Sequence, residues 1–428
     1  MMKKRSFESI GESLYEERLP NGLRLCVVPK QGFRSNYAVL AVDYGGAHRC
    51  FTLGGVRHET PAGVAHYLEH KMFDLPGGDN ALDILTANGA DPNASTGADM
   101  TAYFFQCTEH FEENLRMLLH FVSTPYFTAE TVDKERGIIT QEIRMGEDDP
   151  GLALYYRLLR MLYAQHPARE RVAGTVESIR DITAETLQLC HRAYYSPANM
   201  VLCVEGDVDP ARIAALAREA LPQEAGPLPE TDFGTETSLL PQERLSRESA
   251  AVSAPQFLIG ARFVPCDKGE ALLRQRLTAS LALRTLIGRS SPFFTGLYAA
   301  GLLNLDFDYE LDFIPGGASL ILGGESRDPE AVLAALEKER EKLEKQGLDG
   351  ERFRLAKRAS LGARLRGLED FENVCFALAS GILDGYCALE GLTLLESIDK
   401  ADCERFLLDV LQPERLALAI CEAEKEEA

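Results

Sequence analysis

The chain has 428 residues and carries 66 acidic against 45 basic side chains, which gives a formal net charge of −21. This length predicts two or more domains, and a hydrophobic content of 45% is enough for sizeable cores. The acidic balance argues against nucleic acid and anionic membranes as partners. It fits equally well a site that attracts basic or neutral peptides and a surface that is simply soluble.

The N-terminus and the cysteines indicate the compartment. The first five residues include three basic ones, but no apolar run follows them. No stretch approaches the length of about eighteen apolar residues that a membrane span needs. The ten cysteines are scattered without a C-x-x-C pair, and several lie in apolar runs. We therefore expect buried thiols, no structural zinc cluster, no signal peptide, no membrane span and a cytoplasmic location.

The first half of the chain predicts a mixture of strands and helices. Strands are expected over 21–30, 37–44, 101–108 and 199–206, and 57–61 is predicted to be a loop. Helices are expected from Gly63 onward, over 80–88, 109–123, 128–145 and about 150–164, and from Thr183 onward.

The helix that Gly63 opens contains the pentapeptide H-Y-L-E-H at positions 66–70. Helical residues three and four apart share a face, so His66, Glu69 and His70 point the same way. Two imidazoles on one face are half of a zinc site, and a glutamate beside them can accept a proton from water. The order H-x-x-E-H is the inverted zincin signature.

The alternative is a pair of surface histidines on an acidic helix. The flanking residues 62–65 and 72–73 are apolar, which favours a buried helix. Buried histidines need partners, so the flanks favour the metal site.

Zinc takes a third protein ligand and keeps one open position. The next helix, which Thr128 is expected to cap, places Glu135 and Glu142 two turns apart on one face. Two solvated glutamates are the alternative. The apolar positions are predicted to hold this helix against a core; they are Val132, Ile138, Ile139 and Ile143.

Residues 222–250 are rich in Pro, Gly, Ser, Thr and Glu and predict a linker between domains at 1–221 and 251–428. The second half predicts strands over 252–263, 302–311 and 318–324 and helices over 269–288, 328–346, 350–368 and 371–388. One constant offset relates Ile182, Pro197, Leu202 and Val204 to Ile398, Pro413, Leu418 and Ile420. This spacing predicts a duplicated domain, of which only the first copy carries the metal motif.

H-Y-L-E-H followed by E-R-G-I-I-T-Q-E-I at 135–143 resembles the pitrilysin/insulinase family of zinc peptidases. The similarity extends through N-A-S-T at 93–96, T-A-Y at 101–103 and Y-S-P-A-N-M-V-L at 195–202. It covers nearly the whole chain and is closest to a bacterial branch with chains of about this length. It implies an α+β fold of two homologous α/β-sandwich halves, each an antiparallel sheet plus helices, that form a clam-like half-chamber.

The resemblance also assigns roles. It implies one Zn²⁺ per chain held by His66, His70 and Glu142, with Glu69 as the general base. Glu135 would be the second carboxylate, which orients a ligand. Asn93 and Ala94 would lie on the strand that pairs with the backbone of a peptide substrate.

The second half departs from the family pattern. Full peptidases of the family place an arginine and a tyrosine in a segment of the form L-R-x-x-x-x-L-x-Y, where they polarise the substrate carbonyl. Here Tyr298 stands at the place of the arginine and Leu305 at that of the tyrosine, and Arg289 is out of register. This favours a related subunit, without the zinc motif, that carries the clamp. A dimer is expected, either homomeric or heteromeric. Alternatively, Tyr298 or Tyr309 supplies the donor.

Taken together, the motifs predict a zinc-dependent endopeptidase that hydrolyses short, unfolded peptides with water activated by Glu69. Two alternatives stay open. One is a non-catalytic scaffold subunit of the same fold, against which the intact zinc set argues. The other is a protease dedicated to removing a leader peptide or maturing one protein.

Overall fold

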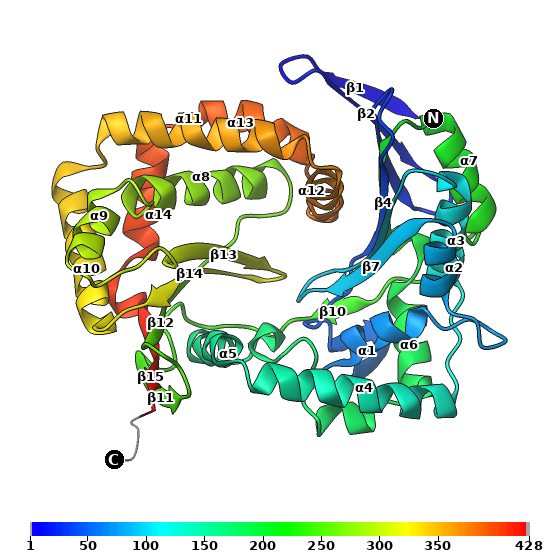
Figure 1. Ribbon diagram of the computed structural model, residues 1–428, viewed down its shortest axis with the longest axis horizontal. Coiled ribbons are helices and arrows are strands. Elements are labelled where there is room, and N and C mark those ends of the chain that lie inside the picture. Colours follow the sequence, from blue (N-terminus) through cyan, green and yellow to red (C-terminus); the bar gives the residue numbers. More distant parts are fainter. Residues whose placement is uncertain (1, 425–428) are drawn as a thin grey trace. The chain divides into compact units, whose positions relative to one another are not determined.

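The computed structural model describes residues 2–424, which form two compact units (Figure 1). The first unit comprises the chain up to Ile143, then Arg171–Phe233 and Leu365–Leu389. The second comprises Arg144–Glu170, Gly234–Arg364 and the chain from Glu390 onward. Each unit contains a sheet and helices, so the predicted α+β class is confirmed. The domain limits at 221 and 251 stay a prediction, since the compact units exchange segments.

The first unit is built on a seven-stranded sheet. The strands, in spatial order, are β1 (Lys3–Phe7), β2 (Glu12–Arg18), β3 (Arg24–Pro29), β9 (Met200–Gly206), β4 (Asn36–Val42), β8 (Thr101–Cys107) and β7 (Ala90–Thr96). Only β3 and β9 run parallel. A small second sheet joins β10 (Glu230–Asp232), β5 (Cys50–Leu53) and β6 (Val56–Glu59).

Both faces of the large sheet are covered. In β4, Ala38 and Leu40 belong to the core under helices α1 (Val64–Met72), α3 (Phe111–Ser123), α6 (Ala184–Tyr194) and α7 (Pro210–Ala220). Val39 and Ala41 face the other way, into a core closed by α12 (Phe371–Leu383). In Figure 1, α12 lies on the opposite side of the sheet from α3 and α7. This alternation is the period of two expected of a strand buried on both faces.

The second unit has a five-stranded sheet in the order β11 (Leu245–Ala250), β15 (Ala417–Ala423), β12 (Gln256–Phe263), β14 (Gly317–Glu325) and β13 (Asp308–Ile314). Helix α5 (Pro150–Leu162) covers one face so closely that a Cβ on Gly260 would lie 2.9 Å from Leu158. On the other face, the ring of Phe263 meets Phe406 of α14 (Lys400–Val410). The remaining helices are α8 (Glu270–Leu286), α9 (Pro292–Ala299), α10 (Pro329–Gln346), α11 (Gly350–Gly367) and α13 (Gly391–Ser397).

The two units repeat one strand plan. In the first, β9 pairs in parallel with β3 and antiparallel with β4, and β8 and β7 follow. In the second, β15 pairs in parallel with β11 and antiparallel with β12, and β14 and β13 follow. Pro197 begins the single 3-10 turn that precedes β9, and Pro413 begins the one that precedes β15. The predicted duplication is therefore confirmed in the topology.

Several local predictions were wrong. Residues 57–61 were expected to be a loop, but β6 pairs with β5 there. The linker region contains β10 and β11. The strand expected at 302–311 begins at Asp308, because Gly301 (φ 66°) and a bond from the Asp306 N–H to Asn304 Oδ1 turn the chain first. The helix expected at 371–388 ends at Leu383, just before Gly385 (φ 80°).

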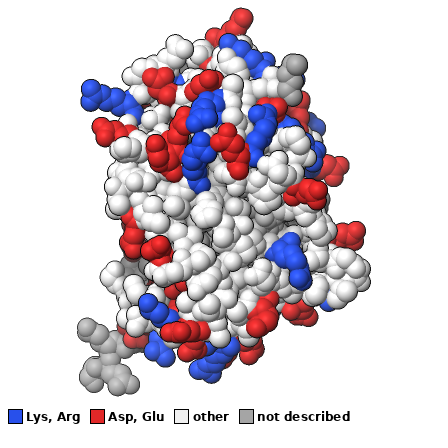
Figure 2. Space-filling model, turned by 90° about the vertical axis from the view of Figure 1, so that its right-hand side faces the viewer, with Lys and Arg blue, Asp and Glu red and all other residues white. Residues whose placement is uncertain are grey.

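In Figure 2, Lys and Arg side chains lie among Asp and Glu side chains toward the top and the bottom of the face, and its middle is largely uncharged. Among the described residues, no single helix is long and apolar enough to cross a membrane. One bent pair, Phe371–Leu383 with Ala388–Ser397, has that length and composition.

One buried carboxyl makes the stability of the first unit depend on pH. Glu205 in β9 is completely buried, 3.3 Å from Lys30 Nζ. Burial raises the pKa of Glu205 from 4.5 to about 8, and Lys30 offsets only part of this effect. Between these two values the folded state binds more protons than the unfolded state. The contribution of Glu205 to the free energy of unfolding therefore falls as the pH rises through this range.

We expect Glu205→Gln, which carries no charge at any pH, to remove this slope. Relative to wild type, its free energy of unfolding should rise by on the order of 4 kcal/mol between pH 5 and pH 9. Denaturant titrations followed by circular dichroism measure the change, and the exposed substitution Glu224→Gln is the control. Parallel pH profiles for wild type and Glu205→Gln would contradict a buried, proton-binding Glu205.

Candidate metal centre

Helix α1 holds the first two candidate ligands. It begins after Gly63, whose φ of 96° lies in the left-handed region and whose Cβ would lie 2.7 Å from the carbonyl oxygen of Ala173. Only glycine satisfies both conditions at low cost. One face of the helix is buried through Val64, Ala65, Tyr67, Leu68 and Met72, and His66 and His70 are half-buried on the adjacent face.

Helix α4 (Ala129–Glu147) supplies the acidic residues. The Thr128 hydroxyl accepts a hydrogen bond from the Thr131 N–H, which confirms the predicted cap. Val132, Ile139 and Ile143 are buried, but Ile138 is 45% exposed. The prediction for Ile138 was wrong because it is out of step with the three-to-four-residue spacing of the others. The Tyr67 hydroxyl donates to the carbonyl of Val132 and ties the two helices together.

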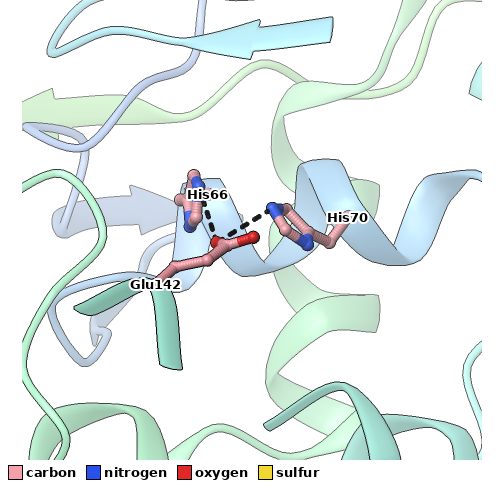
Figure 3. Close-up of side chains that lie close together, drawn as sticks. All are labelled: His66, His70 and Glu142. Carbon is pink, nitrogen blue, oxygen red and sulfur yellow. Dashed lines mark ion pairs between the residues drawn. The ribbon is translucent and has the colours of Figure 1, made fainter. Parts of the chain in front are cut away.

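The two helices bring His66, His70 and Glu142 together (Figure 3). Glu142 Oε2 is 3.6 Å from His70 Nε2 and 3.9 Å from His66 Nε2. One donor atom from each of the three residues lies within 4.8 Å of the other two. In Figure 3 the carboxylate of Glu142 points at both imidazoles, which come from the same helix.

Glu135 lies on the other side of the His70 ring. Its Oε1 is 2.9 Å from His70 Nδ1, a hydrogen bond that places the proton on Nδ1 and leaves the lone pair on Nε2. The same bond lowers the pKa of Glu135. By contrast, His66 Nδ1 is buried without a hydrogen-bond partner among the described residues. The two histidines are therefore held differently.

The protonation states suit metal binding. Burial, aided by repulsion from His70, lowers the pKa of His66 to about 4, so this imidazole is neutral at pH 7. For His70, burial acts to lower the pKa, but the bond to Glu135 and the charges of Glu142 and Glu69 together raise it. A metal ion competes with that proton for His70 and needs the neutral ring.

Glu69 is 8% exposed, and burial raises its pKa. The Thr96 hydroxyl at the end of β7 donates to Glu69 Oε2 and partly counteracts that shift. Sequence reasoning did not assign Thr96 a role, although it ends the N-A-S-T match. The hydroxyls of Tyr103 and Tyr195 lie 2.7 Å apart in the core. The T-A-Y segment at 101–103 and the Y-S-P-A-N-M-V-L segment at 195–202, both of which resemble the family, therefore contact each other.

The predicted substrate-pairing residues lie on a sheet edge. β7 pairs with β8 alone, with Asn93 opposite Phe104 and Ala94 opposite Tyr103. Asn93 is exposed and Ala94 half-buried. The other edge of β7 leaves backbone groups free for a further strand. Their contact with substrate stays a prediction.

In the second unit, the two positions that align with the clamp arginine and tyrosine are occupied by Tyr298 and Leu305. Tyr298 in α9 is 49% exposed and Leu305 is 57% exposed. Arg289 Nη2 donates to the carbonyl of Leu305 at 2.9 Å, and the Tyr309 hydroxyl donates to the carbonyl of Ser280 at 3.4 Å. Arg289 and Tyr309 line one cavity of about 340 Å³ together with Arg284, which sequence reasoning missed.

An α+β chain that carries H-x-x-E-H on one helix and two glutamates on the helix packed against it has the features of a zinc metallopeptidase. Residues 51–176 match the family described as Insulinase (Peptidase family M16). Residues 181–360 match the domain described as Peptidase M16 inactive domain. The chain therefore belongs to peptidase family M16 and to the metallopeptidases.

Individual relatives agree with this assignment. The chain is 33% identical to the uncharacterized zinc protease YmfH of Bacillus subtilis, over 98% of both chains. A crystal structure of a putative M16-like peptidase from Alicyclobacillus acidocaldarius is 30% identical, with a TM-score of 0.94 over 98% of this chain and 100% of that chain. Pitrilysin shares the fold, with 18% identity and a TM-score of 0.79, over 100% of this chain and 47% of that chain.

The residues present fit the zinc that the relatives' names carry. Two imidazoles and a carboxylate are a donor set that zinc takes in catalytic sites. Three donors already converge, and a hydrogen bond to a carboxylate orients one imidazole from behind, as is common for metal-binding histidines.

We expect Glu135→Gln to weaken zinc binding by roughly 10- to 100-fold, because His70 loses the carboxylate that orients it. His70→Ala, which removes a ligand, should lose the metal altogether. Competition with a chelator of known affinity measures both losses. Glu130→Gln, at an exposed position of the same helix, is the control. Unchanged zinc affinity in Glu135→Gln would show that Glu135 does not orient His70 for metal binding.

Proposed function

We propose that this protein is a zinc endopeptidase in which His66, His70 and Glu142 hold one Zn²⁺ per chain and Glu69 acts as the general base. The observation that supports it best is the convergence of three donor atoms within 4.8 Å beside a buried glutamate. Zinc in such a site supplies Lewis-acid chemistry and lowers the pKa of water toward about 7.

The chain's own residues handle the proton. Glu69 is one residue from His70, on the face that carries both imidazoles, so its carboxylate reaches a water in front of them. It accepts the proton as that water attacks a peptide carbonyl and then passes the proton to the leaving amine. The hydroxyl of Thr96 holds one carboxylate oxygen of Glu69, which leaves the other for this transfer.

The free edge of β7 supports a peptide substrate bound as an added strand. Asn93 and Ala94 would face the peptide backbone, and their exposed edge offers hydrogen-bonding groups with the spacing of a strand. An added strand requires an extended chain, which favours short or unfolded peptides over folded proteins.

We further propose that a second, related chain completes the active site. Two observations support a split site: Tyr298 and Leu305 occupy the clamp positions, and this chain matches 47% of pitrilysin. The arginine and tyrosine of the proposed second chain would stabilise the developing oxyanion. The present chain alone should therefore turn over substrate roughly 10²- to 10³-fold more slowly than a mixture of the two chains. Full turnover by the isolated, monomeric chain would contradict a split site.

The cytoplasm is the proposed location. All ten cysteines are thiols outside any disulfide, and most are buried, as expected of a protein that folds under reducing conditions. Cys266, however, is exposed, contrary to the expectation of buried thiols.

The central test is Glu69→Gln. This variant should keep stoichiometric zinc, because Glu69 is not among the three converging ligands. It should lose cleavage of a quenched-peptide pool by roughly 10²- to 10⁴-fold, because the base is gone. The assay uses the protein alone and with its partner chain. Near-wild-type turnover with zinc bound would exclude Glu69 as the base.

A further inference from the structure

The first unit contains a pocket that lies away from the candidate metal centre. It has a volume of about 520 Å³ and lies where β4 and β8 meet the start of α12. Gln106 lines it, five residues along β8 from Thr101, which pairs with Thr96 beside Glu69. At about 3.3 Å per residue, the two ends are on the order of 17 Å apart. The lining residues are Phe33, Ser35, Tyr37, Gln106, Glu369, Asp370, Phe371 and Glu372.

The pocket is acidic. Asp370 is occupied as the cap of α12, where it accepts from the N–H and the side-chain amide of Asn373 at 3.2 and 2.8 Å. Glu369 and Glu372 are exposed, and neither carboxylate has a hydrogen-bond or ion-pair partner among the described residues. The helix terminus explains the position of Asp370, but it explains neither the unpaired glutamates nor the aromatic lining.

Tyr37 is the second, independent feature. Its side chain is 2% exposed, yet its hydroxyl is buried without a partner among the described residues. The ring stacks on Phe104 with centroids 5.9 Å apart, so packing holds the hydroxyl at the pocket. An unsatisfied buried hydroxyl costs on the order of 1–3 kcal/mol. A ligand that donates a hydrogen bond to it would recover that energy.

The aromatic wall completes the chemistry. Phe33 is 55% exposed, and its ring lies 5.5 Å from that of Phe371. A large exposed ring beside unpaired carboxylates is an arrangement that suits a cation. Ring faces attract cations, and Arg and Lys side chains also bury their apolar stems against such rings.

We propose that this pocket binds the guanidinium or ammonium group of a basic side chain in a peptide. Glu369 and Glu372 accept from its N–H groups, the Tyr37 hydroxyl accepts one more, and Phe33 and Phe371 pack against its stem. Arginine suits the pocket better than lysine, because its planar fork serves several acceptors at once. As a substrate preference the inference rests on the proposed function, but the binding itself is measured without cleavage.

The test uses the full-length, zinc-loaded Glu69→Gln protein, so that no turnover interferes. Two fluorescent peptides are compared by anisotropy, identical except that one carries arginine and the other citrulline, its uncharged analogue. We expect the arginine peptide to bind on the order of tenfold more tightly. Equal binding of the two peptides would overturn the proposal.

Variants locate the effect. Glu369→Gln combined with Glu372→Gln should abolish the preference for arginine. Glu109→Gln combined with Glu113→Gln, exposed acids on the same unit, should preserve it. Tyr37→Phe removes only the hydroxyl and should lower arginine affinity about threefold without loss of stability. Equal loss of the preference for arginine in both double variants would indicate a general effect of charge. It would contradict the proposal that this pocket binds the arginine side chain.

Two further experiments test whether the cation belongs to a peptide or to a small free molecule, and whether its binding depends on the metal centre. Acetyl-arginine amide should compete more weakly than the peptide, as expected for a side-chain pocket within a longer binding site. Competition at equal affinity would overturn the peptide assignment in favour of a small free cation. His70→Ala should lose zinc but keep the preference for arginine, so failure of the proposed function would be distinguishable from failure of this inference.

Discussion

The packing of α1 against α4 is the constraint on which the metal centre depends. The ring of His70 lies between two carboxylates that are two helical turns apart, with Glu135 on Nδ1 and Glu142 near Nε2. Residues seven apart on a helix are separated by about 10.5 Å. Both carboxylates can therefore reach one imidazole only if the helices hold a single register. Buried Val132, Ile139 and Ile143 and the bond from Tyr67 to the Val132 carbonyl fix that register.

The candidate metal ligands lie in one unit, although both units share the same strand plan. Both sheets place a central strand between a parallel and an antiparallel neighbour, so the repeat preserved the sheet. The candidate ligands, however, come from the helices α1 and α4 and not from the sheet. α8 of the second unit carries no histidine, and this unit instead has a cavity lined by Arg284 and Arg289. The two units therefore share the strand plan of their sheets and differ in the side chains that their helices carry.

The sequence predicted those parts of the structure that local spacing governs. The i, i+4 pair His66 and His70, the seven-residue pair Glu135 and Glu142 and the cap at Thr128 depend only on helix geometry, and the structure places them as expected. Thr96 was missed because its contact with Glu69 spans two elements far apart in sequence. Strand β6 was missed because its pairing with β5 overrides weak local propensity. Tyr37 looked like an ordinary strand residue, since only the position of α12 shows its hydroxyl to be unpaired.

The most direct measurement is the anomalous scattering of zinc in crystals of the metal-loaded protein, collected on both sides of the zinc absorption edge. The account predicts one peak per chain, about 2.0–2.2 Å from a nitrogen of His66, a nitrogen of His70 and an oxygen of Glu142. The peak should be absent in crystals of His70→Ala. A zinc peak at any other cluster of residues, or full occupancy in His70→Ala, would contradict it.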